Sequence, residues 1–352
     1  MAILDQLGPQ LAAATKLLRA LRQPPQELVA VDFDPAATRC VRLKVSGAEV
    51  EALAADILPA LDLGDEAQVK AFELPKPLAA RYVAICIPGS GAIVKLLNFP
   101  GALDDKAEEQ IREHMGVGEG AFRFGYRLIS QTRSETRLLT VAIPEAQVQA
   151  ACAVFPTGLP APTSVEVSGL AVMSAFLHGP AAAAQDEAVG VVEFGARDTY
   201  FAFFKKRELV LIRKFDFGHL NLLERLERGM GADRQTALNI MRDQSFDISQ
   251  LIKDMTDPFI KQLVISQHFV ERRENCHISR IFVPDDPSIT RVWLNDIKAA
   301  VGLEVGTWHP FEGVKLLPEA LSGKLEASRC DFAAAVGAAL AKFEEGRGGS
   351  GG

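Results

Sequence analysis

Residues 187–218, EAVGVVEFGARDTYFAFFKKRELVLIRKFDFG, decide the fold of this chain. They predict three consecutive strands at 189–194, 200–204 and 209–215, because three apolar runs are separated by a Gly195/Asp198 turn and by a charged turn. Glu193 stands at the end of the first strand, and Thr199 stands just before the second. An acidic side chain beside a tight turn whose N–H groups face outward is able to hold a metal ion next to phosphate oxygens.

The same pattern occurs earlier in the chain. Residues 28–43, LVAVDFDPAATRCVRL, again contain an apolar strand, an acidic residue, a phenylalanine, four further residues and a threonine before the next strand. Asp32, Phe33 and Thr38 precede Glu193, Phe194 and Thr199 by a constant 161 residues. The repeat therefore predicts two equivalent lobes, each with a hairpin tip that faces the other.

Composition excludes several classes of protein. A chain of 352 residues is long enough for two or more domains, and 48% hydrophobic with 24% charged residues is ordinary for a globular protein. The net charge of −7 argues against a nucleic-acid partner. Five scattered cysteines without C-x-x-C spacing favour reduced thiols over disulfides or a zinc site. No apolar stretch approaches the roughly 18 residues of a membrane span, so we expect a cytoplasmic protein.

The remaining patterns predict a multi-part α/β chain. Residues 3–22 predict an amphipathic helix with late basic residues, which either lies on a membrane or partner or folds onto the body of the protein. Residues 256–275 predict a helix capped by Thr256, with Pro258 in its first turn, and 179–186 predict a hinge. The predicted parts are an N-terminal helix and linker at 1–25, a first-lobe core at 26–90, 160–180 and 330–345, an inserted small α/β domain at 91–159, a second-lobe core at 186–216 and 265–329, a helical insert at 217–264 and a flexible tail at 346–352.

From Leu28 to Leu340 the order of motifs resembles the PilM family of type IV pilus assembly proteins, relatives of the actin-like division protein FtsA. The two hairpins, the Ile87-Pro88-Gly89 strand end, the stretch 165–176 (VEVSGLAVMSAF), the Arg213-x-Phe-x-Phe-Gly218 stretch and a final helix of small residues occur in the family's order. The resemblance implies an actin-like (ribonuclease H-like) two-lobed α/β fold, with ATP between the lobes and a small domain inserted in the first lobe.

The resemblance also implies a partner. In that family the inserted domain and the first lobe bind the short cytoplasmic tail of a single-span inner-membrane protein of the PilN type, at the cytoplasmic face of that membrane. We expect the edge of the insert to present this groove, on residues Ile93, Val94, Leu96, Leu97 and Phe99. The alternative is that these side chains only fill the insert's own core.

The nucleotide site of this chain departs from the family pattern at the first hairpin. Asp32-Phe33-Asp34-Pro35 stands where the family offers a glycine and free N–H donors, and Pro35 has no N–H to give. Two like charges about 4 Å apart at an effective dielectric of ~20 repel by roughly 4 kcal/mol, or about a thousandfold in affinity. Asp34 is therefore expected to weaken phosphate binding.

The other contact positions depart as well. Glu193 replaces an aspartate in the second hairpin, where Gly195 and Thr199 are retained before Gly218. The family's Ala-Glu-x-x-Lys, on the purine side, corresponds to residues 237–241 and ends in Met241. Its Gly-Gly corresponds to Pro284-Asp285. Together with Asp32, Asp34 and Thr38, these positions are predicted to form a degenerate nucleotide site without a catalytic residue or a metal.

We therefore expect a non-catalytic scaffold that binds the tail of a PilN-type protein and uses neither ATP nor Mg²⁺ as a cofactor. A working actin-family ATPase is one alternative. The cytoplasmic domain of a GspL-type secretion protein and a self-associating, polymer-forming protein are others.

Overall fold

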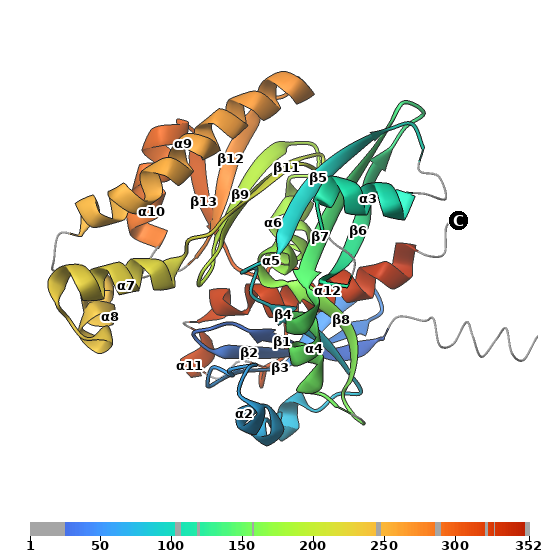
Figure 1. Ribbon diagram of the computed structural model, residues 1–352, viewed down its shortest axis with the longest axis vertical. Coiled ribbons are helices and arrows are strands. Elements are labelled where there is room, and N and C mark those ends of the chain that lie inside the picture. The colour runs from blue at the N-terminus through green and yellow to red at the C-terminus, as the bar shows by residue number, and fades with distance from the viewer. Residues whose placement is uncertain are drawn as a thin grey trace, which may run out of the picture.

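The computed structural model describes residues 25–102, 107–117, 120–156, 158–243, 248–285, 290–320, 323–326 and 328–348. Two lobes, each built on its own sheet, lie one above the other in Figure 1, and a smaller three-stranded sheet stands beside the upper lobe. The helix predicted at 3–22 lies outside the described residues.

The first lobe is built on a six-stranded sheet. Its order is β14-β3-β2-β1-β4-β8. The first three strands form an antiparallel meander, and the next two run parallel to the first. The bounds are β1 (Glu27–Phe33), β2 (Thr38–Ser46), β3 (Glu49–Leu58), β4 (Tyr82–Ile87), β8 (Ala161–Val167) and β14 (Lys315–Leu316). The long apolar runs of β1 and β4 are buried on both faces, as expected for central strands.

The second lobe repeats this topology in five strands. Its order is β11-β10-β9-β12-β13, again a meander followed by two parallel strands. The bounds are β9 (Ala188–Phe194), β10 (Thr199–Lys205), β11 (Glu208–Phe215), β12 (Ile278–Pro284) and β13 (Glu304–Trp308). The two equivalent lobes that the 161-residue repeat predicts are therefore confirmed.

Helices cover both sheets. Those of the first lobe and the segment leading to the second are α2 (Glu66–Ala71), α4 (Glu145–Ala153), α5 (Ser168–His178), α6 (Pro180–Ala183), α11 (Gly323–Glu326) and α12 (Ala333–Gly348). Those of the second lobe are α7 (His219–Met230), α8 (Arg234–Asp243), α9 (Ser249–Glu274) and α10 (Thr290–Val301). In Figure 1, α9 and α10 lie on the outer side of the second sheet, while α5 and α12 lie between the lobes.

Strand β10 shows how one sequence period serves two cores. Tyr200 and Phe204 belong to the apolar cluster that also contains the core of the first lobe, whereas Phe201 and Phe203 belong to the cluster under α9. Successive side chains of a strand point to opposite faces, so the alternation follows directly from the strand geometry. Strand β10 therefore joins the second lobe to the first.

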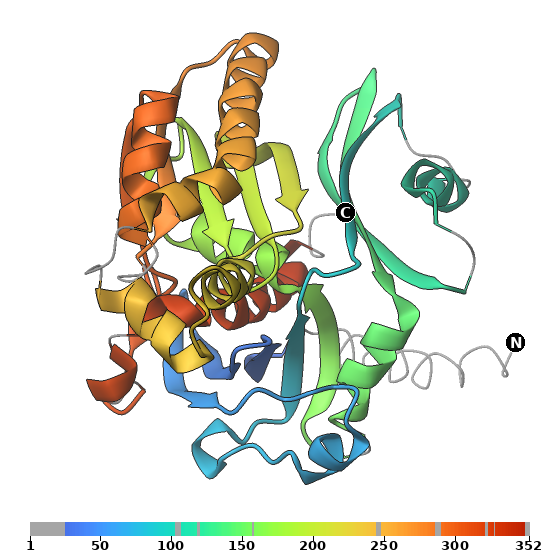
Figure 2. The same cartoon turned by 60° about the vertical axis from the view of Figure 1, so that its left-hand side comes forward.

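The inserted unit is a small sheet of order β5-β7-β6. Its elements are β5 (Ile93–Pro100), α3 (Ala107–Met115), β6 (Phe122–Gln131) and β7 (Glu135–Pro144). Figure 2 shows α3 on the face turned away from the second lobe. Helix α4, which falls within the predicted insert, packs against β4, and its Val148 and Ala151 belong to the first-lobe core.

Several local predictions differ from the structure. Helix α9 begins at Ser249, so the predicted Thr256 cap is wrong: Thr256 is buried within the helix and Pro258 is also internal. The packing of α9 under the second sheet outweighs the backbone hydrogen bond that Pro258 cannot donate. The predicted hinge at 179–186 contains the short helix α6, whose Pro180 and Ala181 are buried. Helix α12 continues to Gly348, beyond the predicted start of the tail.

Candidate functional site

The two hairpin tips face each other across one cleft. The cavity measures about 120 Å³, and both β1–β2 and β9–β10 tips line it together with the first residues of α5 and the end of β12. Of the residues predicted from the sequence, Asp32, Asp34, Glu193, Gly195 and Pro284 line the cavity. The charged side chains that line the cavity are five acidic residues and two arginines, namely Asp32, Asp34, Glu193, Asp198, Asp331, Arg39 and Arg197.

The first tip satisfies its own polar groups. The Asp34 carboxylate accepts the N–H of Ala36 at 2.8 Å, and it pairs with Arg39 Nη1 at 3.1 Å. The same Arg39 nitrogen lies 4.0 Å from Asp32 Oδ2. Arg39 is the cross-strand partner of Asp32 on β2, so the strand register itself places the guanidinium between the two carboxylates.

Asp32 is buried at the end of β1. Its Oδ1 lies 2.7 Å from Ser168 Oγ, the first residue of α5, and Ser168 Oγ also lies 3.0 Å from the carbonyl of Ile87. Burial, followed by the charge of Asp34, raises the pKa of Asp32 from its usual value of 3.8 to about 7, although Arg39 and Ser168 act in the opposite direction. The folded protein therefore retains the Asp32 proton at a pH where the unfolded chain has lost it.

This shift gives a pH-dependent effect on stability. Because the folded-state pKa of Asp32 is raised, the free energy of unfolding falls as the pH rises from about 4 to 7. Asp32→Asn removes this ionisation. The free energy of unfolding of the variant is therefore expected to rise relative to that of the wild type by about 1 kcal/mol per pH unit across that window. Urea unfolding at pH 4.5, 6 and 7.5 measures the difference. Asp254→Asn, on an exposed turn of α9, is the control, and parallel pH curves for Asp32→Asn and the wild type would contradict the assignment.

The second tip is closed by backbone contacts. The N–H of Gly195 donates to the carbonyl of Asp198 at 3.0 Å, and the N–H of His219 donates to the carbonyl of Gly195 at 3.0 Å. A Cβ at Gly218 would lie 2.3 Å from the Gly195 carbonyl oxygen, so only glycine allows this approach. Thr199 is fully buried, and its hydroxyl donates to the carbonyl of Phe217 at 2.7 Å. Gly218 and Thr199 therefore stabilise the second tip through backbone contacts and lie outside the cavity lining.

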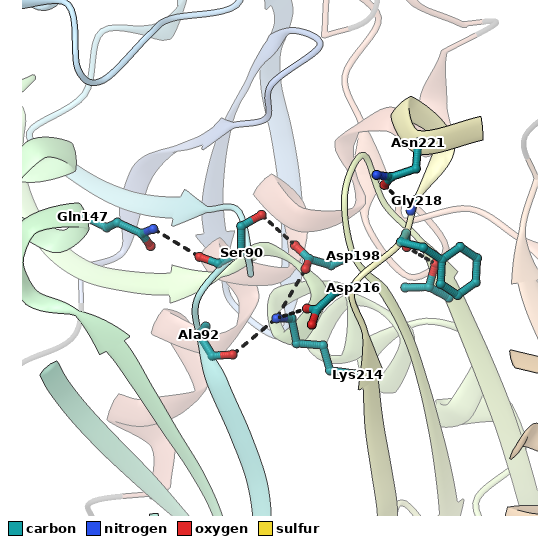
Figure 3. Close-up of polar contacts among 10 residues, drawn as sticks. Ser90, Ala92, Gln147, Asp198, Lys214, Asp216, Gly218 and Asn221 are labelled. Atoms are coloured by element: carbon teal, nitrogen blue, oxygen red, sulfur yellow. Dashed lines mark hydrogen bonds and ion pairs between the residues drawn. The ribbon is translucent and has the colours of Figure 1, made fainter. Parts of the chain in front are cut away.

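Polar contacts join the two lobes beside the cleft (Figure 3). Lys214 Nζ at the end of β11 lies 3.4 Å from Asp198 Oδ1 and 2.8 Å from Asp216 Oδ1, and it donates to the carbonyl of Ala92 at 3.3 Å. Ser90 Oγ lies 3.5 Å from Asp198 Oδ2. Burial raises the pKa of Asp198, and Lys214 opposes that shift. The loop between β4 and β5 is thus tied to the second tip.

Two large side chains in the cleft were missed by the sequence analysis. Arg39 and Tyr200 follow the paired threonines Thr38 and Thr199, and each is the cross-strand partner of its own hairpin's acidic residue. Tyr200 is 1% exposed, and its hydroxyl has no hydrogen-bond partner within the described ranges. The signal was present in the repeat, because the same 161-residue offset relates residue 39 to residue 200.

Among the described residues, the predicted positions Thr38 and Asp285 lie outside the cavity lining. Thr38 is fully buried behind the first tip, and no described residue forms a hydrogen bond with its hydroxyl. The N–H of Asp285 donates to the carbonyl of Trp308 at 2.9 Å. The carbonyl of Asp285 accepts a hydrogen bond from the Cys330 thiol at 2.8 Å. Met241 lies in the last turn of α8, and its side chain lies outside the described residues.

The strand predicted to bind a partner is divided between two faces. Phe99 is buried in the core under α3, and Ile93 and Leu97 pack against that core. Val94 and Leu96 point the other way. They are half-buried and lie with three other side chains on the face opposite α3, here called the inner face and made of Val94, Leu96, Ile129, Leu139 and Val141.

The described residues contain neither a candidate metal cluster nor a candidate membrane-spanning helix. No group of three or more His, Cys, Asp or Glu side chains lies close enough together there to hold a metal ion. No helix in that part of the chain is long and apolar enough to cross a membrane.

Comparison with known proteins identifies the fold and the family. The family model described as type IV pilus assembly protein PilM matches residues 43–343. A solved PilM-PilN type IV pilus biogenesis complex matches with a TM-score of 0.73 and 17% identity, over 91% of this chain and 99% of that one. No curated protein matched the chain.

Two more distant structures also match. A Bacteroides thetaiotaomicron protein with an actin-like ATPase fold has a TM-score of 0.48 and 10% identity, over 86% of this chain and 95% of that one. An archaeal actin homolog has a TM-score of 0.43 and 10% identity, over 91% and 99%. The fold of this chain is actin-like, and because the family model spans most of its length, the chain belongs to the PilM family of type IV pilus assembly proteins.

Proposed function

We propose that this protein is a non-catalytic, actin-like scaffold that binds the cytoplasmic tail of a PilN-type membrane protein at the cytoplasmic face of the inner membrane. Membership of the PilM family and the similarity to a PilM-PilN complex support the partner. The main support for the absence of catalysis is the first hairpin tip, where Asp34 pairs with Arg39 and accepts the N–H of Ala36.

That tip offers little to a triphosphate. Pro35 has no N–H, and the N–H of Ala36 already donates to Asp34. The nearest cation, Arg39, is paired with Asp34. An approaching phosphate would have to displace this ion pair and would then meet the charge of Asp34, a repulsion of roughly 4 kcal/mol at an effective dielectric of ~20. The residues present therefore do not fit Mg-ATP.

The purine side adds a second obstacle. The Asp285 carbonyl accepts a hydrogen bond from the Cys330 thiol, so the backbone just after β12 is already in contact with the first lobe. Pro284 lines the cavity beside that loop, and its ring fixes the backbone dihedral φ. A base would have to displace this contact in order to lie on the backbone.

For the partner, the inner face of the insert is the surface we favour. It carries five half-buried apolar side chains that pack in part against the core cluster of the first lobe. Its outer strands, β5 and β6, pair with no further strand among the described residues. Charged pairs stand at its borders, since Arg127 lies 3.7 Å from Glu344 and Arg137 lies 3.5 Å from Glu274. An extended apolar tail would cover the exposed part of these side chains and would add a strand beside β5 or β6.

A charge placed on the inner face tests this surface. Leu96→Asp is expected to weaken binding of the purified PilN-type tail by at least about 30-fold, since burying an unpaired carboxylate costs about 2 kcal/mol or more. Leu128→Asp is the control, because Leu128 is half exposed on the α3 side of β6. Fluorescence anisotropy of a labelled tail peptide measures both affinities. Equal affinities for Leu96→Asp and the wild type would remove the inner face from the proposal.

A further inference from the structure

The side chain of Tyr200 crosses from the second lobe into the first. A Cβ at Gly169, in the first turn of α5, would lie 2.2 Å from Tyr200 Cε2, and a Cβ at Gly89 would lie 2.1 Å from Tyr200 Oη. Both glycines belong to the first lobe, whereas Tyr200 lies on β10 of the second. The ring is therefore held between two backbone segments of the opposite lobe, each of which has glycine at the point of contact.

The Tyr200 hydroxyl is buried and has no hydrogen-bond partner among the described residues. Leaving a buried polar group unpaired is costly, so the hydroxyl does not stabilise this contact, and the ring is the part of Tyr200 that joins the lobes. The Arg39 Nε–H is a second buried donor that has no hydrogen-bond partner in the described part of the chain, and Arg39 lines the same cavity. Two polar side chains of the protein itself therefore stand in the cleft between the lobes.

The two side chains are equivalent through the internal repeat. Arg39 lies opposite Asp32 on the first hairpin, and Tyr200 lies opposite Glu193 on the second. Arg39 brings a positive charge to Asp32 and Asp34, which is the role that a divalent cation has beside paired carboxylates. Tyr200 brings a rigid ring that spans the two lobes.

We propose that Arg39 and Tyr200 act together as an internal substitute for a metal-nucleotide ligand, with Arg39 supplying the cation and Tyr200 holding the lobes closed. This inference rests on the proposed function, in which the cleft takes no nucleotide. The protein then keeps one lobe arrangement without a ligand, and the surface that the insert presents stays constant whatever the nucleotide level.

Hydrogen exchange of the nucleotide-free protein tests the Tyr200 contact. Tyr200→Leu is expected to raise the exchange rates of amides in residues 89–91 and 168–172 at least tenfold, because the ring that covers them is lost. Phe203→Leu is the matched control, since Phe203 lies on the same strand but belongs to the second-lobe core. Tyr200→Phe keeps the ring, so it is expected to retain wild-type protection. Equal exchange at these amides in Tyr200→Leu and Phe203→Leu would overturn the inference.

A magnesium titration tests the role of Arg39. Arg39→Met leaves two neighbouring carboxylates without their cation, so at about pH 8.5 about 10 mM MgCl₂ is expected to raise its melting temperature by several degrees. The wild type and Arg42→Met are expected not to respond, because Arg42 pairs with Glu27 away from the cleft. An Arg39→Met protein as insensitive to Mg²⁺ as the wild type would overturn the assignment. Binding of Mg-ATP by the wild type would instead refute the proposed function.

Discussion

Gly337→Ala is expected to destabilise the protein by about 3 kcal/mol or more, although a helix usually gains from this change. Gly337 lies in α12 where that helix crosses α5, and a Cβ there would lie 1.7 Å from the carbonyl oxygen of Ala171. Backbone cannot give way as a flexible side chain does, so the two helices must separate and the apolar contacts around them are lost. Chemical unfolding followed by circular dichroism measures the change.

Gly229→Ala provides the matched control for this prediction. Gly229 is also inside a helix, α7, but no described atom beyond its chain neighbours and the backbone of its own helix lies within 4 Å of a Cβ built there. The same substitution is therefore expected to stabilise the protein by about 0.5–1 kcal/mol, because alanine loses less backbone entropy than glycine on forming a helix. If both variants shifted stability in the same direction, the close packing of α5 on α12 would be wrong.

Phe176→Ala is expected to cost about 3–5 kcal/mol, the range for removing a fully buried phenylalanine. Phe176 projects from α5 into the second lobe, where its ring centroid lies 5.8 Å from that of Phe204, 5.2 Å from Phe282 and 5.5 Å from Trp308. The substitution therefore leaves a cavity at the contact between the lobes. We also expect the two lobes to unfold at separate denaturant concentrations in this variant.

The control for Phe176 is a phenylalanine outside the core. Phe269 on α9 is 45% exposed and has Arg273 5.2 Å from its ring. Phe269→Ala removes the same atoms and is expected to cost less than about 1 kcal/mol, with both lobes still unfolding together. Equal costs for the two variants would contradict the assignment of Phe176 to a shared core.

Much of the fold could be predicted from the sequence because β-meanders have strong local signals. The apolar runs and turn residues of 187–218 fall within one residue of the observed strands, and the 161-residue repeat identifies the second copy. Local sequence patterns predict helix boundaries less well where tertiary packing determines them. Thr256 and Pro258 suggested a helix start, yet α9 continues through both because its apolar side packs under the second sheet.

The candidate site was predicted only in part. The residue types at Asp34 and Pro35 indicated a poor phosphate site, and the structure adds why the tip is stable as it stands: Asp34 accepts the Ala36 N–H and pairs with Arg39. That pairing depends on the register of β1 with β2. The position of Tyr200 depends on the contact between lobes, which no local pattern contains. The division of β5 into two faces likewise required the position of α3.

Thermal unfolding of the wild-type protein with about 5 mM Mg-ATP tests the central claim most directly. A true ligand at one hundred times its Kd adds about 2.7 kcal/mol to the free energy of unfolding and raises the melting temperature by several degrees. With Asp34, Arg39 and Tyr200 lining the cleft, we predict the same melting temperature with Mg-ATP as with MgCl₂ alone. A rise of several degrees that Mg-ATP produces and MgCl₂ does not would contradict the account.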